Sequence, residues 1–216
     1  MTERMRSFRN GWTASWNTIS DRENGTGTDC GEERKEKGSL SANGMGILIC
    51  GLNGCGKSTL GRALADRLGY EFIDNEDLYF PKTDENYAFS APRSREEAIR
   101  ILETRIDRNS RFVFAAVKGD YGDRLIASLD HIVLVEVPKK IRSRRVRERS
   151  FRKFGERILP GGDLHDREEA WFALTDSRPE DYTEKWLETV RCPVIRVDGT
   201  LPVEENAEYL SNQLKL

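Results

Sequence analysis

One stretch near the start of the chain has the residue types and the spacing of a phosphate-binding loop. The apolar residues 47–50 precede the sequence GLNGCGKST, which matches the Walker A pattern G-x-x-x-x-G-K-S. Leu60, Leu64 and Leu68 recur at helical spacing after it, so the loop stands between a predicted strand and a predicted helix. A glycine-rich turn that only joins these elements would not explain the lysine and the serine. The sequence therefore predicts a loop that binds the phosphates of a nucleoside triphosphate.

The residues of this loop have different expected roles. Glycines allow the backbone to turn so that successive N–H groups converge on phosphate oxygens, at the positive end of the following helix. Lys57 should reach the β- and γ-phosphates, and the Ser58 hydroxyl should bind Mg²⁺. The loop residues expected to contact the nucleotide are Gly51, Asn53, Gly54, Cys55, Gly56, Lys57, Ser58 and Thr59.

Acidic residues follow the next predicted strand. Residues 70–73 end at Asp74, and Glu76 and Asp77 come soon after it. Phosphoryl transfer needs positioned cations around the γ-phosphate and an acid near the attacking hydroxyl, and Asp74 or Glu76 could supply that acid. Aspartate at a strand exit also occurs as a turn or helix-capping residue, so both interpretations of Asp74 stay open.

The elements around these residues follow the order of an α/β fold. Apolar runs predict strands over residues 47–50, 70–73, 111–117, 132–137 and 192–197. Helical patterns and their start and stop signals predict helices over residues 58–68, 94–108, 139–157, 166–177, 180–190 and 202–214. Five short strands alternating with helices predict a five-stranded parallel sheet in a three-layer α/β/α sandwich.

Composition excludes several classes of protein. The chain has 216 residues, of which 37% are hydrophobic, and its net charge of −2 excludes a globally basic nucleic-acid binder. The four cysteines form no CxxC pair and there are two histidines, so neither a zinc site nor a disulfide framework is expected. A reducing cytoplasm is the expected setting. No apolar run has the length of a membrane span, and the N-terminus lacks the apolar core of a signal peptide.

Residues 1–44 differ in composition from the rest of the chain. They are rich in Gly, Ser, Thr, Asn and charged residues, which predicts a disordered N-terminal extension. Trp12 and Trp16 are four residues apart and could instead mark a short helix that docks on the domain. Met45 stands directly before the first predicted strand, so we expect the folded domain over residues 45–216.

Two further segments have a distinctive composition. Residues 75–93 lack clear periodicity and hold several aromatic side chains, as expected of a loop that covers a substrate. Residues 139–157 carry ten Lys and Arg against two Glu, a local net charge of +8. The arginines that recur near one face of this helix are Arg142, Arg145, Arg149 and Arg152. Such a face is either solvated or placed to meet phosphates.

The run GLNGCGKSTLGRALADRLGYEFIDNEDLY resembles the opening of nucleoside-monophosphate-kinase-like P-loop proteins, a branch that includes shikimate, gluconate and adenylate kinases. The resemblance covers residues 45–212 in layout, while its specific motifs lie in the quoted run. It implies a P-loop kinase-like domain that uses ATP and Mg²⁺. The chain lacks the GGG turn of shikimate kinases and the DGFPR run of adenylate kinases, so neither substrate is implied.

The resemblance also implies roles for residues beyond the loop. In that branch a D-x-D pair after the second strand serves Mg²⁺ and the acceptor hydroxyl, and it maps here onto Asp74 and Glu76, with Glu as a departure. The segment AAVKGDYGDRL is similar to a turn of gluconate kinases, which puts Lys118 near the acceptor. Asp120 in the same segment fits either a Mg²⁺ ligand or a turn residue.

Three segments map onto the outer parts of that branch. Residues 75–93 correspond to the acceptor-side loop, and residues 139–165 correspond to the LID, whose arginines close over the triphosphate. Arg149 is the LID arginine expected to assist catalysis. The turn at Asp198 lies where the branch borders the adenine ring, so Asp198 is a further candidate for nucleotide binding.

Two functions follow from these observations. The first is transfer of the γ-phosphate of ATP to a small hydroxylated or phosphorylated metabolite, by a monomer or homodimer that contacts no membrane. The second is a nucleotide-dependent regulatory protein or ATPase that binds nucleic acid or a protein partner through its basic segment. The net charge disfavours nucleic acid as a partner, and the local charge of the basic segment keeps it open.

Overall fold

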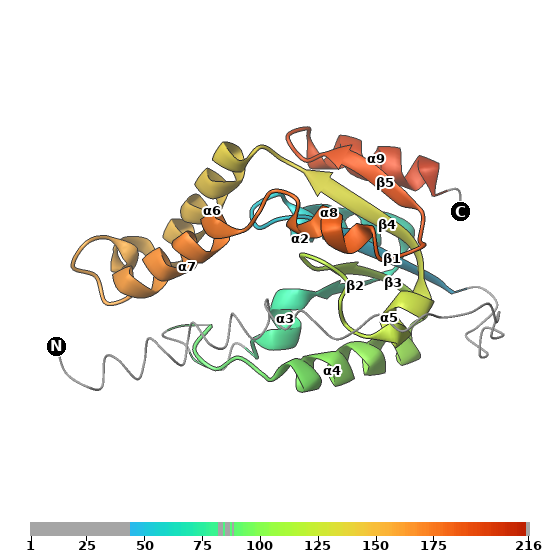
Figure 1. The fold of residues 1–216 in the computed structure, drawn as a ribbon, viewed down its shortest axis with the longest axis horizontal. Coiled ribbons are helices and arrows are strands. Elements are labelled where there is room, and N and C mark those ends of the chain that lie inside the picture. The colour runs from blue at the N-terminus through green and yellow to red at the C-terminus, as the bar shows by residue number, and fades with distance from the viewer. Residues whose placement is uncertain (1–43, 82–83, 85–86, 88, 215–216) are drawn as a thin grey trace.

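Apolar runs form the five strands at the centre of the structure (Figure 1). The computed structural model describes residues 44–81, 84, 87 and 89–214. The strands are β1 (Met45–Cys50), β2 (Glu71–Asp74), β3 (Arg111–Ala115), β4 (Leu129–Glu136) and β5 (Val194–Asp198). They pair in the order β2-β3-β1-β4-β5, and every pairing is parallel. The predicted five-stranded parallel sheet is confirmed.

Helices cover both faces of this sheet. One face packs against α2 (Lys57–Leu68) and α9 (Val203–Gln213). The other packs against α3 (Asn75–Tyr79), α4 (Arg95–Arg108), α5 (Asp123–Ser128) and α8 (Tyr182–Leu187). Alternation along β1 supplies both cores, since Ile47 and Ile49 join the first and Leu48 and Cys50 the second. The three-layer α/β/α sandwich is therefore confirmed. None of the described helices combines the length and the apolar character that crossing a membrane requires.

Between β4 and β5 the chain forms an arm that we call the LID arm. It consists of α6 (Lys139–Phe154), the 3-10 turn η1 (Gly155–Ile158) and α7 (His165–Ser177), and it extends from the sheet at the left of Figure 1. The arm has an apolar cluster of its own, formed by Val146, Ile158, Leu164, Trp171 and Phe172 together with Tyr87. The segment expected as a basic helix and loop over residues 139–165 therefore continues into a second helix packed on the first.

The structure corrects the expectation for two short segments. Residues 75–79 form helix α3 instead of part of an aperiodic loop, because the Asp74 side chain accepts a hydrogen bond from the Glu76 backbone N–H and caps the helix. Helix α5 after β3 was not expected, since its six residues are too few to show a helical period. Elsewhere the observed ends differ from the predicted ones by a few residues, as in α8 and β5.

The expectations for residues 1–44 lie outside the described residues, except at Gly44. We propose, from composition, that this segment contributes little to the stability of the domain. Deleting residues 1–43 is expected to shift the melting temperature by less than about 2 °C, because little apolar surface would be lost. Thermal melts of the full chain and the deletion should be compared directly. A drop of several degrees would show instead that Trp12 and Trp16 pack on the domain.

Candidate active site

The Walker A loop joins β1 to α2 through three glycines with positive φ. The angle is 137° at Gly51, 81° at Gly54 and 99° at Gly56. At Gly54 an added Cβ would also lie 2.4 Å from the carbonyl oxygen of Arg142, so a side chain is excluded there. Gly56 precedes the first turn of α2 and provides no side chain to cap it. The N–H groups of that turn have no side-chain cap, and uncapped N–H groups at a helix N-terminus can bind an anion.

Lys57 and Ser58 line a pocket of about 310 Å³ at this loop, and Asn53 lines it beside them. The Lys57 Nζ donates a hydrogen bond to the carbonyl oxygen of Leu52 at 3.1 Å, so the side chain lies across its own loop. The lysine is therefore already held where phosphates would meet the loop amides.

Two other loop residues direct their side chains elsewhere. Cys55 is 1% exposed and packs in the core between the sheet and helices α2 and α9. Thr59 is exposed and does not line the pocket. Any contact that Cys55 or Thr59 makes with a nucleotide would come from its backbone N–H group.

Asp74 and Glu76 line the same pocket, at the carboxyl end of β2. The Asp74 Oδ1 accepts the capping hydrogen bond at 2.9 Å, so this residue caps α3 while it borders the pocket. The Glu76 carboxylate lies 4.0 Å from Arg149 Nη1 and 3.8 Å from Lys153 Nζ, both on α6. The fold thus brings the loop lysine, the two acids and Arg149 to one pocket.

Two further acids lie away from this pocket. Asp77 is exposed on α3. Asp198 ends β5, where its carboxylate accepts hydrogen bonds from the Thr200 N–H at 2.8 Å and hydroxyl at 2.6 Å. These bonds lower the pKa of Asp198 and hold it as a turn carboxylate. Asp198 instead borders a second concavity of about 600 Å³, together with Gly51 and Glu136.

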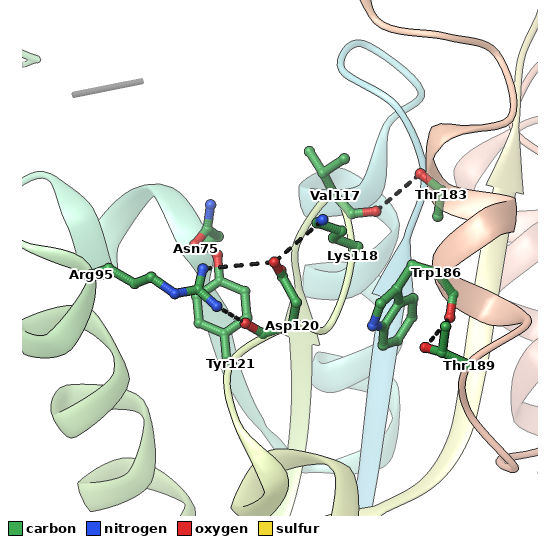
Figure 2. A network of polar contacts seen from close by, with 9 residues as sticks. All are labelled: Asn75, Arg95, Val117, Lys118, Asp120, Tyr121, Thr183, Trp186 and Thr189. Carbon is green, nitrogen blue, oxygen red and sulfur yellow. Dashed lines mark hydrogen bonds and ion pairs between the residues drawn. The ribbon is translucent and has the colours of Figure 1, made fainter. Parts of the chain in front are cut away.

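A polar network lines the pocket after β3 (Figure 2). The Asp120 Oδ2 lies 3.4 Å from Lys118 Nζ and 3.7 Å from Arg95 Nη1, and the two cations approach from opposite sides in the figure. The Tyr121 hydroxyl donates a hydrogen bond to Asn75 Oδ1. Asp120 therefore forms ion pairs with both Lys118 and Arg95. A residue that only shapes a turn would not require these pairs.

Lys118 stays protonated in this network. Burial by itself lowers the pKa of Lys118, but the Asp120 carboxylate and the Tyr182 hydroxyl outweigh burial and leave the pKa above its ordinary value. The Lys118 Nζ also lies 4.7 Å from the centre of the Tyr182 ring. The ammonium group is thus fixed at the pocket wall by one acid and one aromatic ring.

Two arginines of the predicted basic face of α6 are paired within the chain. Arg142 is 5% exposed, and its Nη2 donates to both carboxylate oxygens of Glu180 at 2.8 Å. The Arg145 guanidinium donates to the Gly199 carbonyl oxygen at 2.9 Å. These arginines attach the LID arm to the rest of the domain, while Arg149 borders the pocket.

Sequence reasoning missed the pocket residues that follow the basic helix. They are Glu168, Trp171, Arg178 and Tyr182. Arg178 donates a hydrogen bond to Asn53 Oδ1 of the Walker A loop, across 125 positions of sequence. A basic residue at the end of a helix, directly before a proline, was the available signal for Arg178. No local pattern distinguishes Glu168 from the other acids of α7.

The fold is shared with a known kinase. The structure of deoxyadenosine kinase from M. mycoides with bound dATP matches with a TM-score of 0.50 at 18% identity, over 80% of this chain and 100% of that chain. At this level of identity the match supports the fold alone.

Sequence comparisons identify the family. The AAA domain family matches residues 47–157, from the strand before the Walker A loop through α6. The chain is 28% identical to the uncharacterized protein YqaC of Bacillus subtilis (strain 168), over 78% of this chain and 96% of YqaC. It is 33% identical to a shikimate kinase of Geobacter sulfurreducens, over 45% of this chain and 54% of that enzyme. The chain therefore belongs to the AAA domain family and is a kinase-like P-loop NTPase.

Proposed function

We propose that the protein transfers the γ-phosphate of ATP to a small hydroxylated or phosphorylated metabolite. The observation that supports this proposal is the single pocket that Lys57, Ser58, Asp74, Glu76 and Arg149 line together. It joins a phosphate cradle to acids suited to an acceptor hydroxyl, and its remaining wall is rich in aromatic side chains. A cytoplasmic location and a monomeric or homodimeric state remain predictions from the sequence.

The residues at the pocket fit a magnesium nucleotide. The Ser58 hydroxyl and the Asp74 carboxylate are hard oxygen donors, and Mg²⁺ takes one or two such protein ligands beside phosphate oxygens. The uncapped first turn of α2 suits the phosphates themselves. Mg²⁺ held by Ser58 and Asp74 would neutralise part of the phosphate charge.

The proposed reaction uses the residues as follows. Asp74 or Glu76 accepts the proton of the acceptor hydroxyl as its oxygen bonds to the γ-phosphorus. The bond between the γ-phosphorus and the bridging oxygen breaks, and ADP leaves with the electron pair. Lys57 stabilises the charge on the transferring group. Arg149 would exchange its contact with Glu76 for phosphate oxygens, and Arg178 already reaches the Walker A loop.

The alternative function, binding of nucleic acid or a partner through the basic segment, receives less support. Two cations of α6 are paired with acids elsewhere in the chain, Arg142 with Glu180 at 2.8 Å and Arg147 with Asp176 at 2.9 Å. Cations that are already paired with acids of the chain neutralise fewer phosphates of a nucleic acid. Fewer counterions then leave the nucleic acid, so its binding is weaker. The basic segment is therefore better suited to contacts within the chain, both inside the LID arm and between the arm and the domain.

ATP turnover by the full chain with Mg²⁺ tests the proposal. A panel of hydroxylated and phosphorylated metabolites is expected to contain an acceptor that raises ADP formation and appears as one phosphorylated product per ADP. Nucleic-acid binding should be measured in parallel at low and at physiological salt, where we expect it to be weak. ADP formation that depends on nucleic acid, and on no metabolite, would support the regulatory alternative instead.

A further inference from the structure

Glu168 brings a carboxylate into the wall of the pocket, away from solvent. The residue lies on α7, is 1% exposed and lines the pocket. Its Oε1 accepts a hydrogen bond from the Tyr87 hydroxyl at 2.8 Å. Its Oε2 is buried and has no hydrogen-bond partner in the described part of the chain. An unpaired buried carboxylate oxygen destabilises the fold. The position of Oε2 therefore favours a ligand that donates a hydrogen bond to it.

The hydrogen bond from Tyr87 explains the burial of only one of the two Glu168 carboxylate oxygens. Burial, and then the Glu168 charge, raise the pKa of Tyr87, so the phenol remains protonated and keeps donating to Oε1 at physiological pH. The Arg167 guanidinium lies over the Tyr87 ring, 5.2 Å from its centre. Holding Tyr87 in place therefore requires Oε1 and leaves the burial of Oε2 unexplained.

The rest of the wall suits a flat organic ring. The aromatic side chains that line the pocket are Tyr79, Phe80, Tyr87, Phe89, Tyr121, Phe154, Trp171 and Tyr182. Aromatic rings bind flat, weakly hydrated groups by stacking and edge contacts, whereas a polyol would lose hydration with few partners in return. A volume of about 310 Å³ is at the lower end of small-ligand pockets.

Charges on the acceptor side favour a neutral ligand. Lys118 lies 3.4 Å from Asp120, and Lys153 lies 3.8 Å from Glu76, so an acceptor carboxylate would compete with acids of the chain. A cationic acceptor would meet Lys153, whose Nζ already occupies the face of Phe89 at 3.8 Å from the ring centre. Both kinds of charged acceptor are disfavoured by these pairs.

We propose that the acceptor is a nucleoside whose base carries an exocyclic amino group, and that Glu168 Oε2 accepts a hydrogen bond from that group. The base would lie among the aromatic side chains, with a sugar hydroxyl toward Asp74. A carboxylate is an acceptor only, so it selects an amino group over the carbonyl oxygen that keto bases present instead. This inference rests on the proposed phosphotransferase function and names the acceptor class of the same pocket.

Calorimetric binding to the full chain without ATP tests the selection. Adenosine and cytidine are expected to bind about 10-fold to 100-fold more tightly than inosine and uridine, as a hydrogen bond to a charged group predicts. Glu168→Gln keeps the size of the side chain but presents an amide N–H₂ group. That variant is expected to lose or reverse the preference for amino nucleosides.

Two controls separate selection from support of the fold. Tyr87→Phe removes the hydrogen bond to Oε1 and leaves Oε2, so it should keep the preference for amino nucleosides. If Glu168 only anchors Tyr87, then Tyr87→Phe and Glu168→Gln would each weaken the binding of all four nucleosides to the same extent. Glu169→Gln makes the same change at the exposed neighbouring position and should alter nothing. Melting temperatures of all variants show whether each remains folded.

The outcomes for the two proposals differ. Equal binding of amino and keto nucleosides, or binding of none, would overturn the nucleoside proposal. Phosphorylation of shikimate or gluconate, and of no nucleoside, would overturn it as well while leaving the phosphotransferase function in place. Because binding is measured without ATP, failure of ATP turnover with every acceptor would count against the proposed function alone.

Discussion

Lys57→Ala is expected to abolish phosphate transfer while leaving the domain folded. The lysine borders the pocket, and its Nζ contacts the Leu52 carbonyl oxygen and the Cys55 sulfur of its own loop. Its ammonium group would therefore act on phosphate charge and adds little to the core. Losing one preorganised cation at the transferring group is expected to lower kcat by on the order of 10³. ATP affinity should fall as well, since in the proposed function the same cation contacts the β- and γ-phosphates.

The exposed lysine of α8 provides a matched control for this variant. Lys185 has 68% of its side chain exposed and pairs with Asp181 one turn away, so Lys185→Ala should keep parental turnover and stability. ATP dissociation constants, turnover and melting temperatures should be measured for both variants. Unchanged ATP affinity and turnover in Lys57→Ala would refute the role assigned to the Walker A loop.

The conformation of the loop between β1 and α2 could be predicted because its information is local. Two glycines, one lysine and one serine at fixed spacing follow a strand and lead into a helix, and Gly51 and Gly56 have the positive φ that such a loop needs. The parallel sheet could be predicted for the same reason, since buried strands appear as short apolar runs. The order of the strands in the sheet could not be predicted, because apolar runs of similar composition do not specify which strands pair with one another.

The wall of the pocket around Glu168 and Arg178 could not be predicted, because its contacts join distant parts of the chain. Tyr87 and Glu168 are 81 positions apart, and Asn53 and Arg178 are 125 positions apart. A glutamate within a helix appears solvent-exposed in sequence unless its partner is known. Glu168 is buried only because α7 folds back over α6 and meets Tyr87 there. Tertiary packing determines the burial and the partners of these residues, and it leaves no local pattern in the sequence.

Composition alone does not show which cations of the basic helix are paired within the chain. Ten cations against two acids left open whether this face is solvated or meets phosphates or nucleic acid. In the structure Arg142 is buried against Glu180 and Arg145 bonds to the Gly199 carbonyl oxygen. Their partners come from segments that follow the helix in sequence, so the pairing was invisible before folding. Arg149 remains the arginine of this face that lines the pocket.

Substituting the acids after β2 is expected to give the second large effect. Asp74→Asn keeps the size of the side chain and an oxygen that can still cap α3, since Asn and Asp are equally good capping residues. The change therefore removes charge with little effect on the fold. If Asp74 acts on Mg²⁺ or on the acceptor proton, kcat should fall by on the order of 10² or more. ATP binding should change less, because that charge matters most in the transition state.

The two neighbouring acids make this test selective. Glu76→Gln removes a pocket carboxylate that faces Arg149 and Lys153, so it should also reduce the transfer rate. Asp77→Asn makes the same kind of change at an exposed position outside the pocket and should keep the parental rate. Single-turnover phosphate transfer at saturating ATP, with the identified acceptor, should be compared across the three variants. Parental rates in all three would mean that Asp74 only caps α3 and that Glu76 only pairs with the LID arm, because neither charge would then act on the hydroxyl.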